Sequence, residues 1–140
     1  MFILIVGAGR VGSAVAKRAL EVGHEVSVLD SDPLSHERLD KDQSTTWEDA
    51  GGRFTVGAAL EVDGLIEAGI EEADVFLAAT RGDNTNLVIA QLAQRRFNVQ
   101  RVVVRVADPG RAAWYGEQGL VTICPTQVAI DQAEQVVLEA

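Results

Sequence analysis

Residues 2–12, FILIVGAGRVG, decide the fold, because an apolar run passes directly into a Gly-x-Gly-x-x-Gly motif with glycines at 7, 9 and 12. An amphipathic segment follows, and a second apolar run over residues 25–29 ends at Asp30. A glycine motif that follows a strand, opens a helix and is trailed by an acid about 20 residues later is the dinucleotide fingerprint of a Rossmann fold. The stretch therefore predicts a β-α-β unit with a nucleotide site at its first turn.

Each position of the motif has a mechanical reason. Gly7 permits the tight turn, Gly9 lets the backbone approach a pyrophosphate, and Gly12 lets the helix pack against the sheet. Phosphates would then face the helix N-terminus, where unpaired N–H groups and the helix dipole favour an anion. Arg10 either adds a guanidinium to that phosphate or covers the loop surface.

Asp30 is expected to accept hydrogen bonds from the ribose hydroxyls of an adenosine. Its charge would repel a 2′-phosphate, so NAD or another adenine nucleotide is favoured over NADP. The alternative is a glycine turn of an α/β fold that holds no ligand.

Length and composition narrow the class of protein. With 140 residues the chain is expected to form one domain, without room for a separate substrate domain. A net charge of −9 argues against nucleic acid and anionic membrane surfaces as direct partners. The single cysteine, Cys124, excludes an internal disulfide and is expected to be a buried structural thiol. No apolar run reaches the ~20 residues of a membrane span and Met1 leads directly into the first strand, so we expect a soluble, cytoplasmic protein without membrane insertion.

Six apolar runs of strand length alternate with segments of helical period, at residues 2–6, 25–29, 53–57, 74–79, 101–106 and 120–124. Continuous apolar runs are typical of parallel strands covered by helices on both faces. Helices are expected over residues 84–96 and 109–117, the second with Pro109 in its first turn. The prediction is a doubly wound, Rossmann-like six-stranded sheet in the order 3-2-1-4-5-6.

Two segments are less regular or less certainly packed. Residues 31–53 are expected to hold one short helix and a mobile loop, in which Trp47 either anchors the loop or covers a ligand. An amphipathic helix over residues 126–139, with Thr126 as N-cap, carries an apolar stripe. The stripe packs either on the chain's own sheet or on a second copy or partner.

Ligands of an open parallel sheet lie beyond the carboxyl ends of the strands, which selects the rest of the pocket. Gly57-Ala58 should approach the adenine, and Ala79-Thr80-Arg81 should lie near the second ribose or the terminal phosphates. Asp83 is either a ligand contact or a plain N-cap. Arg105 either binds phosphate or pairs with Asp108 or another carboxylate.

Catalytic equipment is missing from the sequence. His24 and His36 have no evident partner, the carboxylates are scattered, and no metal-binding spacing is found. We therefore expect no metal and no enzyme activity: the ligand is a signal rather than a substrate.

Several segments together resemble a known family. They are residues 7–12 (GAGRVG), 28–33 (VLDSDP), 68–74 (AGIEEAD), 79–80 with 83–87 (AT and DNTNL), and 104–106 with 108–109 (VRV and DP). In order and position they are similar to the amino-terminal domain of potassium-conductance regulators, the RCK or KTN domains of Trk and Ktr uptake systems. The resemblance implies a cytosolic subunit, peripheral to the membrane, that binds NAD, NADH, ATP or ADP and gates a membrane potassium transporter. AMP is a further candidate ligand. It also implies a homodimer or larger ring, which can include a second RCK-type subunit.

The resemblance assigns roles to residues. Gly7 to Val11 would hold phosphates, Asp30 the ribose, Thr80 and Arg81 the distal part of the ligand, and Arg105 a phosphate or the nicotinamide side. The complete predicted set is Gly7, Ala8, Gly9, Arg10, Val11, Gly12, Asp30, Ser31, Ala58, Ala79, Thr80, Arg81 and Arg105.

Three departures from the family pattern stand out. Gly57-Ala58 replaces the usual Gly-Asp, the loop after Asp32 is several residues longer, and the carboxyl-terminal sensing domain is absent from the sequence. The chain is thus expected to be a stand-alone half or an excised domain. Two other functions stay open: a small NAD-dependent oxidoreductase with a substrate site across a dimer, and an assembly module that binds no nucleotide.

Overall fold

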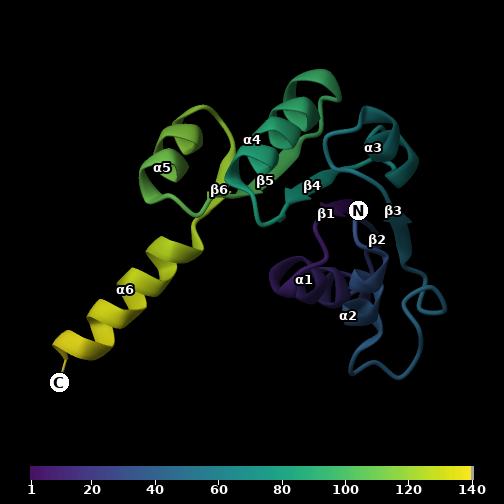
Figure 1. Ribbon diagram of the computed structural model, residues 1–140, viewed down its shortest axis with the longest axis horizontal. Helices are drawn as coiled ribbons and strands as arrows, with labels where there is room; N and C mark the ends of the chain where they lie inside the picture. The colour runs from purple at the N-terminus through teal and green to yellow at the C-terminus, as the bar shows by residue number, and fades with distance from the viewer. Residues whose placement is uncertain (140) are drawn as a thin grey trace.

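Six parallel strands form a single sheet in the order β3-β2-β1-β4-β5-β6 in a computed structural model, which describes residues 1–139 (Figure 1). The strands are β1 (Phe2–Val6), β2 (Glu25–Asp30), β3 (Arg53–Val56), β4 (Val75–Ala78), β5 (Arg101–Arg105) and β6 (Val121–Ile123). The predicted strand order is confirmed, and each strand lies within a residue or so of its predicted run at either end. The order reverses between β1 and β4, so the carboxyl ends of these two strands mark the switch point.

The sheet is buried on both faces, as its continuous apolar strands predict. Side chains alternate along a strand, so Leu4 and Val6 of β1 point into one core cluster and Ile5 points into the other. Helix α1 (Arg10–Glu21) and helix α2 (His36–Asp40) cover the Ile5 side. Helices α3 (Val62–Ala68), α4 (Asp83–Gln91) and α5 (Pro109–Glu117) cover the other side.

The helices match those predicted from the sequence, except that one ends in a π-helical turn and one was not predicted. The predicted helix over 84–96 is α4 followed by a π-helical turn, η2 (Leu92–Arg96), and α5 has the predicted bounds. Helix α3 is not predicted from the sequence, because it is only seven residues long and contains Gly64. A 3-10 turn, η1 (Pro33–Ser35), leads into the single short helix α2 that was expected between β2 and β3.

Trp47 anchors the irregular segment that follows α2. Its side chain is only 2% exposed, and its Nε1 donates to the carbonyl oxygen of Arg53 at 2.9 Å. The backbone N–H of Trp47 donates to Asp40 at 2.8 Å. Gly52 lies so close to the indole that a Cβ there would meet the ring at 2.1 Å. The anchoring interpretation is therefore confirmed over the ligand-covering one.

Helix α6 (Pro125–Leu138) projects away from the sheet and buries none of its described residues (Figure 1). The expectation that its stripe packs on the chain's own sheet is wrong. Its N-cap is Cys124 rather than the predicted Thr126, because Pro125 fills the first helical position and the Cys124 Sγ accepts from the Gln127 N–H at 3.4 Å. Within residues 1–139 no helix has the length and apolar character needed to cross a membrane.

Cys124 itself is half-buried rather than buried. The thiol donates to the Ala107 carbonyl oxygen at 3.4 Å, and the side chain packs against the core on the α4 side of the sheet. The expectation of a fully buried thiol is wrong because the strand it follows, β6, is an edge strand.

Candidate functional site

The glycine turn joins β1 to α1, and two of its glycines are required by packing. Gly7 has φ +106°, and a Cβ there would lie 2.6 Å from the Ala79 carbonyl oxygen. A Cβ on Gly12 would lie 1.8 Å from the Gly7 carbonyl oxygen. Gly9, in contrast, faces open space, with no atom within 4 Å of the position of its missing Cβ. The turn thus leaves its open side at Gly9, at the N-terminus of α1.

Asp30, at the end of β2, holds this turn in place. One carboxylate oxygen accepts from the Ala8 N–H at 2.7 Å, and the other accepts from the Asp32 N–H at 2.8 Å. A carboxylate oxygen has two lone pairs, so both oxygens keep the capacity to accept a further hydrogen bond. This structural role of the acid was not foreseen from the sequence.

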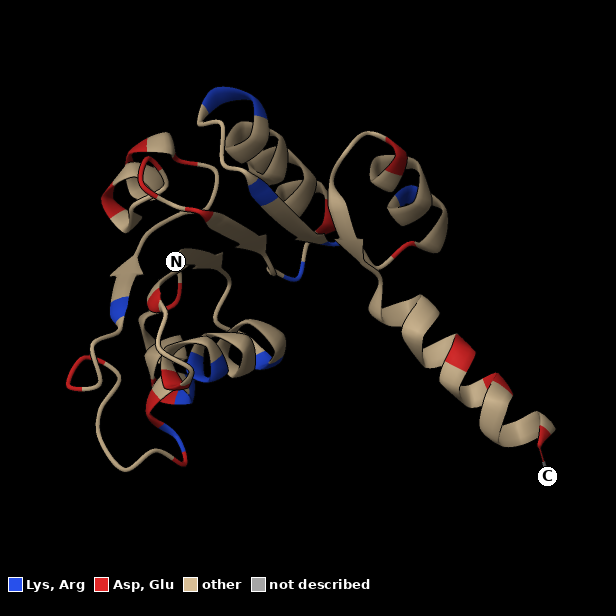
Figure 2. Ribbon diagram, turned by 180° about the vertical axis from the view of Figure 1, so that it is seen from behind, with Lys and Arg blue, Asp and Glu red and all other residues tan. Residues whose placement is uncertain are grey.

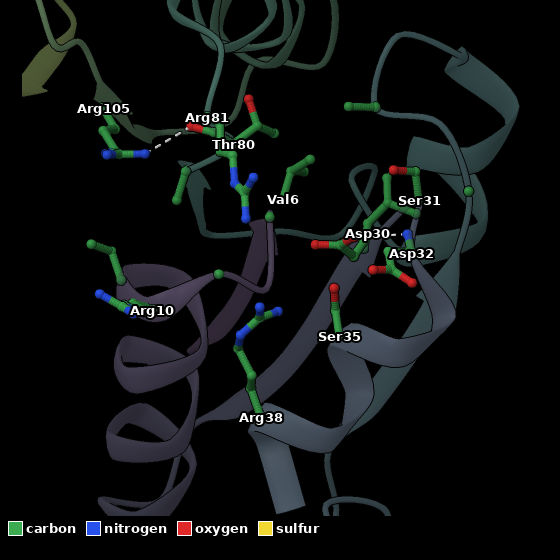
Figure 3. Close-up of a pocket in the computed structure, with 17 residues that line it drawn as sticks. Val6, Arg10, Asp30, Ser31, Asp32, Ser35, Arg38, Thr80, Arg81 and Arg105 are labelled. Carbon is green, nitrogen blue, oxygen red and sulfur yellow. Dashed lines mark hydrogen bonds between the residues drawn. The ribbon is translucent and has the colours of Figure 1, made fainter. Parts of the chain in front are cut away.

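A hollow of about 660 Å³ opens beyond the carboxyl ends of the central strands (Figure 3). That volume lies in the range of small-molecule sites, ~300–1,000 Å³. Ten of the thirteen predicted residues line the hollow: Gly7, Gly9, Arg10, Val11, Asp30, Ser31, Ala79, Thr80, Arg81 and Arg105.

Three predicted residues do not line the hollow. The side chain of Ala8 is 0% exposed in the core, Gly12 lies behind Gly7, and Ala58 points to solvent. Ala58 follows β3 in a loop that does not keep the alternation of a strand, and its two neighbours, Gly57 and Ala59, line the hollow instead. Gly57, expected near the adenine, also lines the hollow, and the lining residues that were not expected there are Val6, Leu29, Asp32, Ser35, Arg38 and Ala59.

The most important of these additions is Arg38 on α2. Its guanidinium points into the hollow and donates to the Ala8 carbonyl oxygen at 3.3 Å. The sequence carries only a weak signal for it: Ser35 and Arg38 are three residues apart, about one helical turn, but α2 is too short to show a clear period.

Charge is divided across the hollow. Asp30 and Asp32 lie beside Ser31 and Ser35 on the β2 side, as Figure 3 shows. Four arginines also line the hollow: Arg10, Arg38, Arg81 and Arg105. In a chain with only 12 Lys and Arg against 21 Asp and Glu, four guanidinium groups around one hollow favour an anion there. The arrangement suits a ligand with a polyol at one end and phosphate at the other.

Arg105 ends β5 and reaches back over the end of β4. Its Nη1 donates to the Thr80 carbonyl oxygen at 3.1 Å, whereas its buried Nε has no partner within residues 1–139. No carboxylate of the described chain lies within 4.0 Å of this guanidinium, so the pairing with Asp108 that was left open is wrong. The charge is left available to the hollow.

Asp83 has a different role from both expected ones. Its carboxylate accepts from the N–H groups of Ala107 at 2.8 Å and Asp108 at 3.2 Å. The N-cap of α4 is Gly82, and Asp83 does not line the hollow. The side chain therefore ties α4 to the segment after β5, a contact between distant parts of the sequence.

His36 has partners, contrary to expectation. One ring nitrogen lies 3.3 Å from Asp40, the other contacts Glu48, and the ring meets Phe54 edge-on at 5.2 Å between centroids. Ligand atoms of His36, Asp40 and Glu48 all lie within 4.8 Å of one another, so among the described residues this group could hold a metal ion. Because the two nitrogens face different carboxylates, the His36 ring joins α2 to the loop that follows it.

The sheet order, the glycine turn at the first β-α junction and the acid at the end of β2 define a Rossmann-type α/β domain. Its switch-point hollow is where such domains place their ligands.

The chain belongs to the TrkA-N domain family, whose model matches residues 3–126. This confirms the resemblance found in the sequence.

One known protein is similar to the chain in sequence, and two solved structures are similar to it in fold. The Trk system potassium uptake protein TrkA of Streptomyces coelicolor is 42% identical over 132 residues, which are 94% of this chain and 56% of that protein. The TrkA-N domain of the inner membrane protein ybaL from Escherichia coli aligns with a TM-score of 0.80 at 17% identity, covering 96% of this chain and 95% of that one. The Kef CTD of Shewanella denitrificans in AMP-bound form aligns with a TM-score of 0.75 at 23% identity, covering 99% of this chain and 80% of that one. The chain spans about half the length of the curated relative.

Proposed function

We propose that the chain is a nucleotide-binding regulatory domain of a potassium uptake system, with NAD, NADH, ATP, ADP and AMP as candidate ligands. One observation carries the proposal: the open glycine turn, two carboxylates and four arginines face one hollow. Two similarities support it. A relative at 42% identity is named a potassium uptake protein, and a solved structure of the same fold is described as AMP-bound.

The charge distribution suggests how a nucleotide would lie. Asp30 would accept the ribose hydroxyls with its free lone pairs, and the phosphates would lie against the open side of Gly9 at the N-terminus of α1. Arg10 and Arg38 flank that turn. The distal part of a longer ligand would reach the end of β4 and Arg105.

The lining favours sensing over catalysis. Among the described residues around the hollow there is no His, Cys, Lys, Tyr or Glu. The two carboxylates there, Asp30 and Asp32, accept backbone N–H groups of the surrounding turns, which favours a binding role for them over proton transfer. The alternative, a small NAD-dependent oxidoreductase, would need these groups from a second copy. A nucleotide that binds one conformation better than another shifts the population, and a coupling of ~1–3 kcal/mol, roughly 5- to 150-fold, is typical.

Assembly is the second part of the proposal. The stripe on α6 includes Ile130, Val136 and Val137, all exposed in the single chain. The charges of this helix are Asp131 and Glu134, visible as red bands on α6 in Figure 2, and they disfavour an anionic membrane surface. We assign the stripe to a second copy of the chain. The resulting dimer, or a ring that includes another RCK-type subunit, would act on a membrane potassium transporter from its cytoplasmic side.

Calorimetric titration of the chain with the five nucleotides tests the binding proposal. We expect binding by at least one of them, and a loss of about tenfold in affinity in Arg10→Ala, because a charge-assisted hydrogen bond to phosphate is removed. Arg18→Ala is the matched control: Arg18 lies on the same helix, is exposed and, within residues 1–139, pairs only with Glu21 at 3.3 Å. Absence of binding by all five at millimolar concentration would refute the proposal.

A further inference from the structure

Asn86, the fourth residue of α4, is a buried polar residue to which no role in the site has been assigned so far. Its side chain is 0% exposed, and it does not line the hollow. A buried amide is costly unless its donors and acceptors are paired, so each of its contacts has to be accounted for.

All the hydrogen-bonding capacity of the Asn86 amide is used. The oxygen accepts from the Thr80 N–H at 2.9 Å and from the Thr80 hydroxyl at 2.6 Å. The nitrogen donates to the Thr80 carbonyl oxygen at 3.0 Å and to the Arg105 carbonyl oxygen at 2.9 Å. Two donors and two acceptor lone pairs are what an asparagine side chain offers. The amide is therefore fully satisfied by two residues of the candidate site.

These contacts replace the strand ladder where it ends. Strands β4 and β5 pair from Val75 with Arg101 to Ala78 with Val104, and the two lining residues Thr80 and Arg105 lie beyond the last pair. Past that point the Asn86 amide bridges the segment after β4 and the end of β5, by donating to the carbonyl oxygens of Thr80 and Arg105. The Arg105 Nη1 also donates to the Thr80 carbonyl oxygen. One side chain thus joins the main chains of two residues on the distal side of the hollow, Thr80 and Arg105, the second of which is also paired with Ile123 of β6.

We propose that Asn86 is a positioning residue for the distal part of the nucleotide. It fixes Thr80 and the base of the Arg105 side chain, so that the guanidinium is held at the far end of the hollow. This inference rests on the proposed function. It assigns the two ends of the ligand to different residues. Asp30 and the glycine turn hold the nucleoside and its first phosphate, whereas Asn86 governs the affinity for the ligand groups that extend beyond that phosphate.

The substitution Asn86→Asp tests this assignment of the two ends of the ligand. The carboxylate has nearly the same shape and keeps the accepting oxygen, but it loses the two donors and faces the carbonyl oxygens of Thr80 and Arg105. We expect the affinity for ATP and NADH to fall about tenfold or more, while the affinity for AMP changes less than about twofold, because AMP ends at the glycine turn. Asn84→Asp is the matched control, with the same chemical change on an exposed residue of the same helix.

A second measurement separates positioning from general destabilisation. In an Arg105→Ala background the Asn86→Asp effect on ATP should largely disappear, because the group being positioned is gone. Thr80→Val removes the 2.6 Å hydroxyl contact to Asn86, together with the longer hydroxyl contacts to the Gly82 backbone at 3.3 and 3.4 Å. It leaves the other three Asn86 contacts in place and should lower ATP affinity in the same direction by a smaller factor. This milder variant decides the matter if Asn86→Asp does not fold.

The outcomes are distinct. If the unmodified chain binds none of the nucleotides, the proposed function falls and the inference falls with it. A second outcome is that the unmodified chain binds nucleotides but the tested variant lowers the affinities for AMP and ATP equally, or lowers neither affinity. Asn86 is then a structural residue only, and the inference is overturned while the proposed function stands.

Discussion

Helices α1 and α6 have similar sequence patterns, but only α1 is covered by the rest of the domain. Each follows a strand through a sharp turn and carries an apolar stripe along one side. Helix α1 buries Gly12, Ser13 and Ala16 against the sheet, whereas α6 buries none of its described residues. The difference teaches that an amphipathic pattern specifies a face to be covered but not the surface that covers it.

The turns that lead into the two helices differ in the same way. The turn before α1 is held by the Asp30 carboxylate, which accepts the Ala8 N–H at 2.7 Å. The turn before α6 is held by the Cys124 thiol, through sulfur contacts of 3.4 Å to Ala107 and Gln127. A charge-assisted hydrogen bond is stronger than a thiol contact, so α1 is fixed to the domain more firmly than α6.

Enlarging the closest contact of α1 should have the largest effect on stability. Gly12→Ala places a Cβ 1.8 Å from the Gly7 carbonyl oxygen, so helix and turn must separate. We expect the free energy of unfolding to fall by about 3 kcal/mol or more, measured by urea titration. Gly64→Ala in α3 is the control, since the nearest atom to its Cβ is 3.5 Å away and alanine favours the helix. Equal stability of the two variants would contradict the close-packing argument.

Removing the carboxylate that holds the turn should have an intermediate effect. In Asp30→Ala the N–H groups of Ala8 and Asp32 lose their acceptor, and we expect the free energy of unfolding to fall by about 2 kcal/mol. The affinities for all nucleotides that bind should fall together, in contrast to the selective loss expected at the distal side. Asp49→Ala, in the exposed loop, is the control for loss of an acid. An unchanged urea midpoint in Asp30→Ala would show that the turn does not depend on this residue.

Charging the stripe of α6 should have the smallest effect on the domain itself. Val137 is 68% exposed, so Val137→Asp should change the free energy of unfolding of the single chain by less than about 0.5 kcal/mol. Association should be lost, leaving a species of 15.0 kDa by light scattering after size-exclusion chromatography. Gln135→Asp adds the same charge on the opposite side of the helix and should leave the dimer intact. A dimer that persists in Val137→Asp would rule out this face as the interface.

The sequence was most informative where structure depends on local chemistry. The strand order and the roles of Gly7 and Gly12 follow from apolar periodicity and from the steric needs of one turn. The sequence was least informative where distant segments meet. Asp83 bonds to residues 24 and 25 positions away, and Asn86 bonds to Arg105 19 positions away, so neither role is visible in a local pattern.

The candidate site follows the same rule. Ten predicted residues line the hollow because the motif places them at strand ends. Ala58 lies outside the lining because its loop does not keep strand alternation. Arg38 was missed because it comes from a helix too short to show a clear period.

The thiol at the base of α6 has a mechanical consequence. Fourteen residues at ~1.5 Å per residue make α6 an arm about 21 Å long. A tilt of about 10° at Cys124 would displace the tip by about 4 Å, on the same geometry. The pivot is bonded to Ala107, two residues beyond Arg105 at the rim of the hollow. A shift too small to disturb the sheet would thus be amplified into a displacement the size of a side chain at the far end of the arm.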